Sequence, residues 1–179
     1  AKVMAGAKPV VMRDIDREFQ SVFIANTASG ITKPEDMRGK SFTFGAKSST
    51  SGHLFPRHFL STQFKIDADK DFKGAPLYSG AHDATVAWVQ AGKVDGGVLN
   101  ASVWDKLVEQ KKVDTSKVRV FATTPPYFDY NWTVRPGLDP ALLGSGEDDA
   151  RLEGRLDAIV VASLAILGDE LAALLPGHG

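Results

Sequence analysis

The sequence predicts an α/β fold in which a mostly parallel sheet is flanked by helices. Two observations lead to this prediction. Short segments rich in β-branched and aromatic residues alternate along the chain with segments of helical periodicity. With 179 residues, of which 43% are hydrophobic, the chain is also able to bury a sizeable core. Strands separated by helices favour a mostly parallel sheet that is covered on both sides.

Six segments have the composition of strands, and three longer ones have the periodicity of helices. The strands are expected at residues 21–25, 41–45, 76–79, 97–99, 118–123 and 132–134, and the helices at 53–64, 81–91 and 101–111. Trp88 lies on the apolar stripe of the second helix and Trp104 on that of the third. Both tryptophans are therefore expected in the core.

Two proline-rich joints indicate where the chain leaves this unit, at residues 124–127 and 135–140. Residues 20–124 are therefore expected to form one complete α/β lobe. Beyond the joints, residues 151–175 have a long amphipathic pattern that predicts a helix.

The composition excludes several classes of function. Twenty-one basic and 22 acidic residues leave a formal charge of -1, too little to recruit nucleic acid or an anionic membrane. The absence of cysteine excludes disulfides, a thiolate nucleophile and a cysteine-based zinc site. The longest apolar run, at 158–168, is shorter than the roughly 20 residues of a spanning helix, so no membrane insertion is expected. No signal peptide is recognisable at the start of the sequence, and one is expected either to have been removed already or to lie outside this chain.

The most informative stretch is FGAKSSTSGH at residues 44–53, where a strand runs into hydroxyls and glycine and then opens a helix. Such a turn presents free backbone N–H groups at the positive end of a helix dipole, with hydroxyl donors beside them. The pattern predicts an anion-binding loop. The alternative is ordinary helix capping, because Ser and Thr are also common N-caps. Lys47 is expected to be a solvated loop residue.

Three further motifs follow: YSGAHDA at 78–84, GKVDGG at 92–97 and YFDYNW at 127–132. Their order and spacing resemble the phosphate-, phosphonate- and phosphite-binding members of the type II periplasmic binding proteins, over residues 21–138. The resemblance implies that the loop hydroxyls wrap an oxyanion and that a histidine donates to it. It also implies a carboxylate near the junction of two lobes. The matching residues are Ser49, Thr50, Ser51, His82 and Asp129.

Two positions depart from the pattern that this resemblance implies. Phe19 stands where a phosphonate binder has a pocket tyrosine, and Ser102 stands where an aminophosphonate binder has a glutamate for the ligand's amine. Both departures favour a smaller oxyanion, such as phosphate, phosphite or methylphosphonate. The resemblance further implies that residues 1–19 and 125–179 are the remnant of another lobe, with an atypical C-terminal helical segment.

Each of these roles has an ordinary structural alternative. Hydroxyl and amide donors to a charged oxygen contribute about 1.5 to 3 kcal/mol each. Ionised Asp129 accepts hydrogen bonds only, so it would select a ligand with an acidic proton over sulfate. The alternatives are that Asp129 caps a turn and that His82 faces solvent at a helix start. His53 and His58 are expected at the surface of their helix. Trp132 is equally compatible with packing and with lining the cleft.

The function expected from this resemblance is the binding of a small oxyanion for uptake by an ABC transporter, with the transporter permease as partner and without a cofactor. Its location would be periplasmic or otherwise extracytoplasmic. An oxyanion-sensing input protein is one alternative. A hydrolase is another, but the Gly-x-Ser-x-Gly elbow is absent, as are the phosphate-binding loops of nucleotide enzymes.

Overall fold

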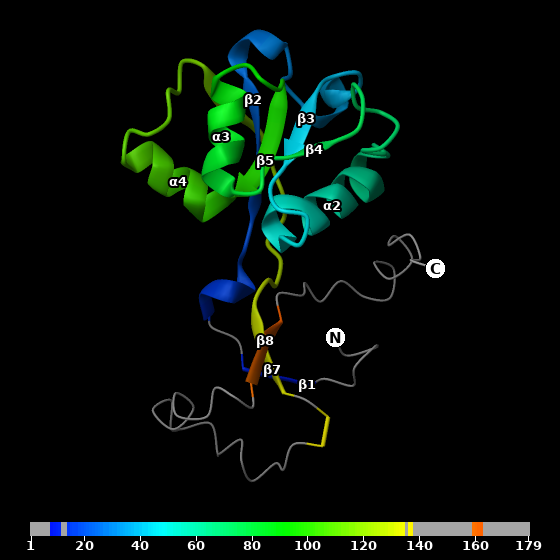
Figure 1. Cartoon of the computed structure of the whole chain (residues 1–179), viewed down its shortest axis with the longest axis vertical. Helices are drawn as coiled ribbons and strands as arrows, with labels where there is room; N and C mark the ends of the chain where they lie inside the picture. The colour runs from blue at the N-terminus through cyan, green and yellow to red at the C-terminus, as the bar shows by residue number, and fades with distance from the viewer. Residues whose placement is uncertain (1–7, 12–13, 135, 138–158, 163–179) are drawn as a thin grey trace. The chain divides into compact units, whose positions relative to one another are not determined.

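The computed structural model describes residues 8–11, 14–134, 136–137 and 159–162, and it reproduces the predicted alternation of strands and helices (Figure 1). The chain divides into two units. The larger contains residues 19–127, and the described residues on either side of it belong to a smaller one.

The larger unit is built on a five-stranded sheet in the order β4-β3-β5-β2-β6. The strands are β2 (Ser21–Asn26), β3 (Phe42–Phe44), β4 (Leu77–Tyr78), β5 (Gly96–Asn100) and β6 (Val118–Thr123). All five coincide with predicted strands, with ends that differ by one residue at most.

Four of the five strands run in the same direction, and β2 runs against them. β3 pairs in parallel with β4 and β5, whereas β2 pairs antiparallel with β5 and β6. The sheet is therefore mixed, although most of its strands share one direction as predicted. Between β2 and β3 lie only the short 3-10 turns η2 (Thr27–Ser29) and η3 (Pro34–Met37). A connection that stays at one end of the sheet returns the chain in the opposite direction.

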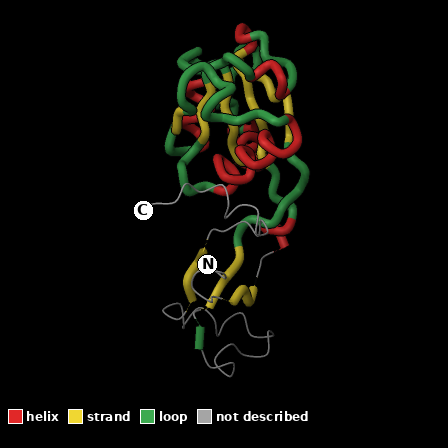
Figure 2. The backbone as a smooth tube through the Cα atoms, turned by 90° about the vertical axis from the view of Figure 1, so that its right-hand side faces the viewer, coloured by secondary structure: helices red, strands yellow, loops and turns green. Residues whose placement is uncertain are grey.

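Three helices cover the sheet: α2 (Phe55–Phe64), α3 (His82–Gln90) and α4 (Ala101–Glu109). Figure 1 shows α2 apart from α3 and α4, and in Figure 2 the strands in yellow lie between helical segments in red. The predicted helix at 53–64 begins differently, because a π-helical turn, η4 (Thr50–Leu54), precedes α2. None of the described helices combines the length and apolar character needed to cross a membrane.

Two hydrophobic clusters fill the two faces of the sheet. Alternate side chains of a strand point to opposite faces, so Phe23 of β2 packs with Leu60 of α2, while Ile24 packs with Val86 of α3. Trp104 is buried in the second cluster, as predicted. β2 is thus buried on both sides, which explains its uninterrupted apolar sequence.

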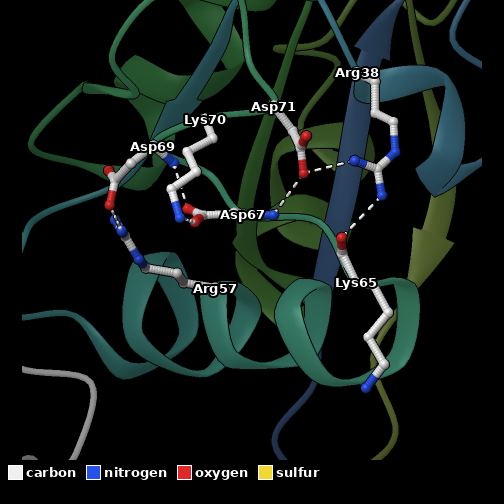
Figure 3. A network of polar contacts seen from close by, with 7 residues as sticks. All are labelled: Arg38, Arg57, Lys65, Asp67, Asp69, Lys70 and Asp71. Carbon is white, nitrogen blue, oxygen red and sulfur yellow. Dashed lines mark hydrogen bonds and ion pairs between the residues drawn. The ribbon is translucent and has the colours of Figure 1, made fainter.

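The loop between α2 and β4 is held by a network of charged side chains (Figure 3). Asp71 Oδ2 accepts from Arg38 Nη1 at 2.6 Å and from the Asp67 N–H at 2.8 Å. Arg57 of α2 pairs with Asp69 in the same loop. Exposed pairs of this kind contribute little one by one; here they join the loop to α2 and to Arg38, the residue that follows η3.

The smaller unit contains a three-stranded antiparallel sheet, β1 (Lys8–Val11), β7 (Asn131–Val134) and β8 (Ile159–Ala162), in the order β1-β7-β8. β7 matches the predicted strand at 132–134. β8 contradicts part of the helix predicted at 151–175, because residues 159–162 pair with β7. Ile, Val and Val in succession favour an extended backbone once a partner strand is present. The rest of that predicted helix lies outside the described residues.

Candidate functional site

The hydroxyl loop after β3 folds back on itself. The Gly45 N–H donates to the Gly52 carbonyl at 2.8 Å. Ser49 caps the turn that follows, because its Oγ accepts from the Gly52 N–H at 3.0 Å. Its carbonyl also accepts from the N–H groups of His53 and Leu54, both at 3.0 Å. Ser49 is thus a cap, as the alternative interpretation held, but its hydroxyl hydrogen is still available for another acceptor.

The next two hydroxyl residues are almost fully buried. Thr50 is 2% exposed and Ser51 is 3% exposed. Within the described part of the chain, Thr50 Oγ1 has no hydrogen-bond partner. The Ser51 carbonyl accepts from Ser21 Oγ at 2.8 Å, and Ser21 Oγ lies 2.8 Å from Tyr127 Oη. A buried hydroxyl without a partner is costly, and the ligand contact predicted for Thr50 stays a prediction.

The loop and His82 meet at Gly52. A Cβ added at Gly52 would lie 3.0 Å from Ser49 Oγ, 3.2 Å from His82 Cε1 and 3.3 Å from Gly45 Cα. Any larger residue would displace one of these groups. Glycine at this position therefore allows the imidazole of His82 to lie directly against the hydroxyl loop.

His82, the first residue of α3, presents a neutral ring. Its Nδ1 accepts from the Asn100 N–H at 3.4 Å, which assigns the ring proton to Nε2. Burial lowers the pKa of His82, and the neighbouring charge of Asp83 opposes this shift only in part. The ring is partly buried, so His82 does not simply face solvent. Its Nε2–H is a donor at neutral pH.

Ser49 and His82 line the same cavity, which has a volume of about 360 Å³. The lining residues are Ala46, Ser49, Gly80, Ala81, His82, Asp83 and Val103. All of them belong to the larger unit. Two residues that carry hydrogen-bond donors, Ser49 and His82, thus line a space whose other lining residues are mostly small and apolar, with Asp83 as the exception.

Four of the predicted site residues lie elsewhere in the fold. Thr50 and Ser51 adjoin Ser49 in the chain but do not line this cavity. Ser102 is exposed, and its Oγ donates to Asn100 Oδ1 at 2.7 Å as part of the cap of α4. Phe19 forms an isolated antiparallel bridge with Tyr127. The roles predicted for these residues stay predictions.

Asp129, the remaining predicted residue, belongs to the smaller unit. It is 1% exposed, and its N–H donates to the Asp16 carbonyl at 3.0 Å. Because the cavity residues belong to the larger unit, the contact of Asp129 with a ligand stays a prediction.

His53 contradicts the prediction that it lies at the surface. It is 9% exposed, and Nδ1 lies 2.7 Å from the Lys47 carbonyl while Nε2 lies 3.2 Å from Tyr78 Oη. The π-helical turn explains the error, because it changes the face on which a residue of the first turn lies. No periodic signal in the sequence marks His53 or Tyr78. Lys47 is exposed, as predicted.

Among the residues that the structure describes, no group of three or more metal-binding side chains comes together. At the cavity, Ser49 and His82 each carry a hydrogen-bond donor, and Asp83 carries a carboxylate.

Comparison with known proteins identifies the family. The family model for the periplasmic substrate-binding protein of phosphonate ABC transporters matches residues 1–144. A probable ABC transporter phosphite binding protein, PhnD1 of Prochlorococcus marinus, is 39% identical over 137 residues. This match covers 73% of the chain but 46% of the relative, so the chain spans about half of that protein's length.

Solved structures agree with this result. The structure of PhnD1 from Prochlorococcus marinus in complex with methylphosphonate is 30% identical, with a TM-score of 0.67, and the match covers 90% of this chain and 68% of that one. XAC2383 from Xanthomonas citri, bound to ATP, is 23% identical with a TM-score of 0.64 over 93% of this chain and 67% of that one, and it shares the fold. The fold is that of the type II periplasmic binding proteins, and the chain belongs to the family of periplasmic substrate-binding proteins of phosphonate ABC transporters.

Proposed function

We propose that the chain binds a small tetrahedral oxyanion, namely a phosphonate, phosphite or phosphate, for uptake by an ABC transporter. The observation that carries this proposal is the cavity in which Ser49 and His82 meet. One donor comes from the loop after β3 and the other from the first residue of α3, and the Gly52 turn brings the two residues together. PhnD1 of Prochlorococcus marinus, which is named for phosphite and was solved with methylphosphonate, supports the same class of ligand.

The donors suit an anion in a protein without a strong net charge. Ser49 Oγ–H and His82 Nε2–H are both available, and the first N–H groups of a helix lack partners within it. Each donor to a charged oxygen contributes about 1.5 to 3 kcal/mol. Thr50 Oγ1, buried without a described partner, would gain one from a ligand oxygen. Asp129 is the proposed selectivity residue, because a carboxylate accepts from a P–OH group and repels a bare dianion.

A small ligand agrees with the residues found at positions 19 and 102, where Phe19 and Ser102 differ from the pattern of phosphonate and aminophosphonate binders. Ser102 has no charge to offer an amine, and its hydroxyl is engaged by Asn100. The apolar side chains of Ala46, Ala81 and Val103 at the cavity would accept a small apolar substituent on phosphorus.

Binding without catalysis is part of the proposal. A nucleophilic serine needs a hydrogen bond to its base. In the described part of the molecule, no hydrogen bond joins Ser49 or Ser51 to His82, and Ser49 Oγ is engaged with the Gly52 N–H. We further propose a transporter permease as partner and an extracytoplasmic location, in line with the family.

Calorimetric titration of the purified chain with phosphite, methylphosphonate, phosphate and sulfate tests the proposal. Saturable binding of at least one phosphorus oxyanion is expected, with weaker binding of sulfate. A Ser49→Ala variant should lose affinity for all of them. Sulfate binding as tight as the best phosphorus oxyanion, or heats indistinguishable from dilution for the whole panel, would contradict it.

A further inference from the structure

Two loops border the cavity, and they leave the same end of the sheet. One follows β3 and supplies Ala46 and Ser49, and the other follows β4 and supplies Gly80 and Ala81. β3 and β4 are parallel neighbours in the sheet. Backbone bonds continue the pairing only a short way, from the Ser79 N–H to the Phe44 carbonyl and from the Gly80 N–H to the Gly45 carbonyl.

The side chain of His53 adds a connection between the first loop and the end of β4, where the second loop begins. A carbonyl oxygen only accepts, so His53 Nδ1–H donates to the Lys47 carbonyl at 2.7 Å in the first loop. The neutral ring then leaves Nε2 as an acceptor, and Tyr78 Oη–H donates to it at 3.2 Å from the end of β4. Burial lowers the pKa of His53, which favours this neutral form.

Ring packing supports the same connection. The imidazole of His53 lies edge-on to Phe44 at 4.8 Å and to Tyr78 at 4.9 Å between ring centroids. Lys47 adds a second link, because its Nζ lies 5.2 Å from the centroid of the Tyr78 ring. Both polar atoms of a buried imidazole are therefore paired, one with the first loop and one with the last residue of β4.

We propose that His53 and Tyr78 form a positioning pair that sets the spacing of the two loops around the oxyanion cavity. Neither residue lines the cavity, so both act through the loops that do. Preorganised donors lose effectiveness when their spacing changes by as little as about 1 Å. The inference rests on the proposed function for its ligand, but the connection between the loops exists without one.

The test compares Tyr78→Phe, His53→Phe and the double variant. Phenylalanine keeps the aromatic packing at either position and removes the hydrogen bonds. In the ligand-free chain, amide hydrogen exchange should become faster in both loops, at Ser49 and at Gly80. Phosphite affinity should fall about 2- to 10-fold for Tyr78→Phe, the equivalent of one net hydrogen bond. The double variant should behave like His53→Phe alone, because the tyrosine hydroxyl then has no partner to lose.

Val113→Ala is the matched control, because Val113 is buried in the hydrophobic cluster on the opposite face of the sheet. It should lower thermal stability without changing exchange in the two loops relative to the rest of the unit. In addition, nitrogen NMR of His53 should show a protonated Nδ1 and an unprotonated Nε2.

Unchanged loop exchange in Tyr78→Phe, an increase spread over the unit as in Val113→Ala, or the opposite tautomer would each overturn the proposal. If the wild-type chain binds no oxyanion, the proposed function fails. The exchange and NMR measurements still decide whether the positioning pair exists.

Discussion

At the residue scale, His82 is the donor whose state the structure defines most clearly. Replacing it with alanine removes the Nε2–H and should weaken phosphite binding by about 1.5 to 3 kcal/mol, or about 10- to 150-fold. His82→Gln retains an N–H donor and should lose less. Titration calorimetry at neutral pH measures both, and equal affinity of wild type and His82→Ala would remove His82 from the site.

Asp129 gives a prediction about selectivity. Asp129→Asn should weaken phosphite binding by at least about 1.5 kcal/mol, the low end for a charge-assisted bond. The difference in affinity between phosphite and sulfate should become smaller at the same time, because an amide can donate a hydrogen bond to sulfate and a carboxylate cannot. Ser51→Ala is the control, since a lost hydroxyl should affect both anions alike. An unchanged preference for phosphite over sulfate would contradict the selectivity role and favour the alternative that Asp129 caps a turn.

Part of the candidate site could be predicted from the sequence, and part could not. Ser49 and His82 follow strands and open helices, so the sequence placed both where donors accumulate, and the structure brings them to one cavity. His53 and Tyr78 carry no such signal. They meet because β3 and β4 are adjacent and because the π-helical turn redirects the first turn of the helix. Strand pairing and the geometry of a helical turn depend on tertiary packing. Neither can be predicted from the local pattern of a single sequence.

At the scale of elements, strand positions were predictable and strand direction was not. Composition marks where the backbone is extended, and all five strands of the larger sheet were found in this way. The reversed direction of β2 depends on the connection from β2 to β3, which contains short 3-10 turns in place of a crossover helix. Hydrophobic pattern alone does not distinguish these two connections.

The turn formed by η4 leads to a prediction about glycine. Gly52→Ala introduces a Cβ that would meet Ser49 Oγ, His82 Cε1 and Gly45 Cα at 3.0 to 3.3 Å. We expect a loss of about 1 to 3 kcal/mol in the free energy of unfolding, as for other overpacked sites. Phosphite binding should weaken as well, because the imidazole has to move.

Gly74→Ala provides the comparison for Gly52→Ala. Gly74 has a φ of +78° but nothing within 4 Å of an added Cβ. Alanine there should cost only the backbone strain, about 1 kcal/mol, and leave phosphite affinity unchanged. Urea unfolding and calorimetry separate the two effects. If both variants lose the same stability and neither loses affinity, the close approach at Gly52 has no functional role.

At the scale of the whole molecule, the cavity depends on one unit of the chain. All of its lining residues lie within residues 19–127, where the alternation of strands and helices made the fold predictable. The smaller unit was harder to predict. Residues 159–162 lie within a sequence of helical periodicity, but they are themselves rich in β-branched side chains. Pairing with β7 makes them a strand. That partner is distant in sequence, so local pattern gave the wrong preference.

The stability of the whole chain should decrease as the pH falls below 6.5. Burial is the main cause that lowers the pKa of both His53 and His82 from the ordinary value of 6.5. The unfolded chain therefore binds protons there that the folded chain does not. The free energy of unfolding is highest above pH 6.5 and declines below it, at most by about 1.4 kcal/mol per pH unit for each histidine.

Carboxylates act in a different range of pH. Hydrogen bonding from Lys70 is the main cause that lowers the pKa of Asp67 from its ordinary value of 3.8, so its contribution is lost only under more acidic conditions. Urea unfolding at about pH 7.5 and about pH 5.5, one unit either side of the histidine value, isolates the histidine effect. The variants His53→Phe and His82→Gln should each reduce the difference between the two pH values. A wild-type chain that is equally stable at both, or more stable at the lower pH, would show that these imidazoles titrate normally and are not held neutral by the fold.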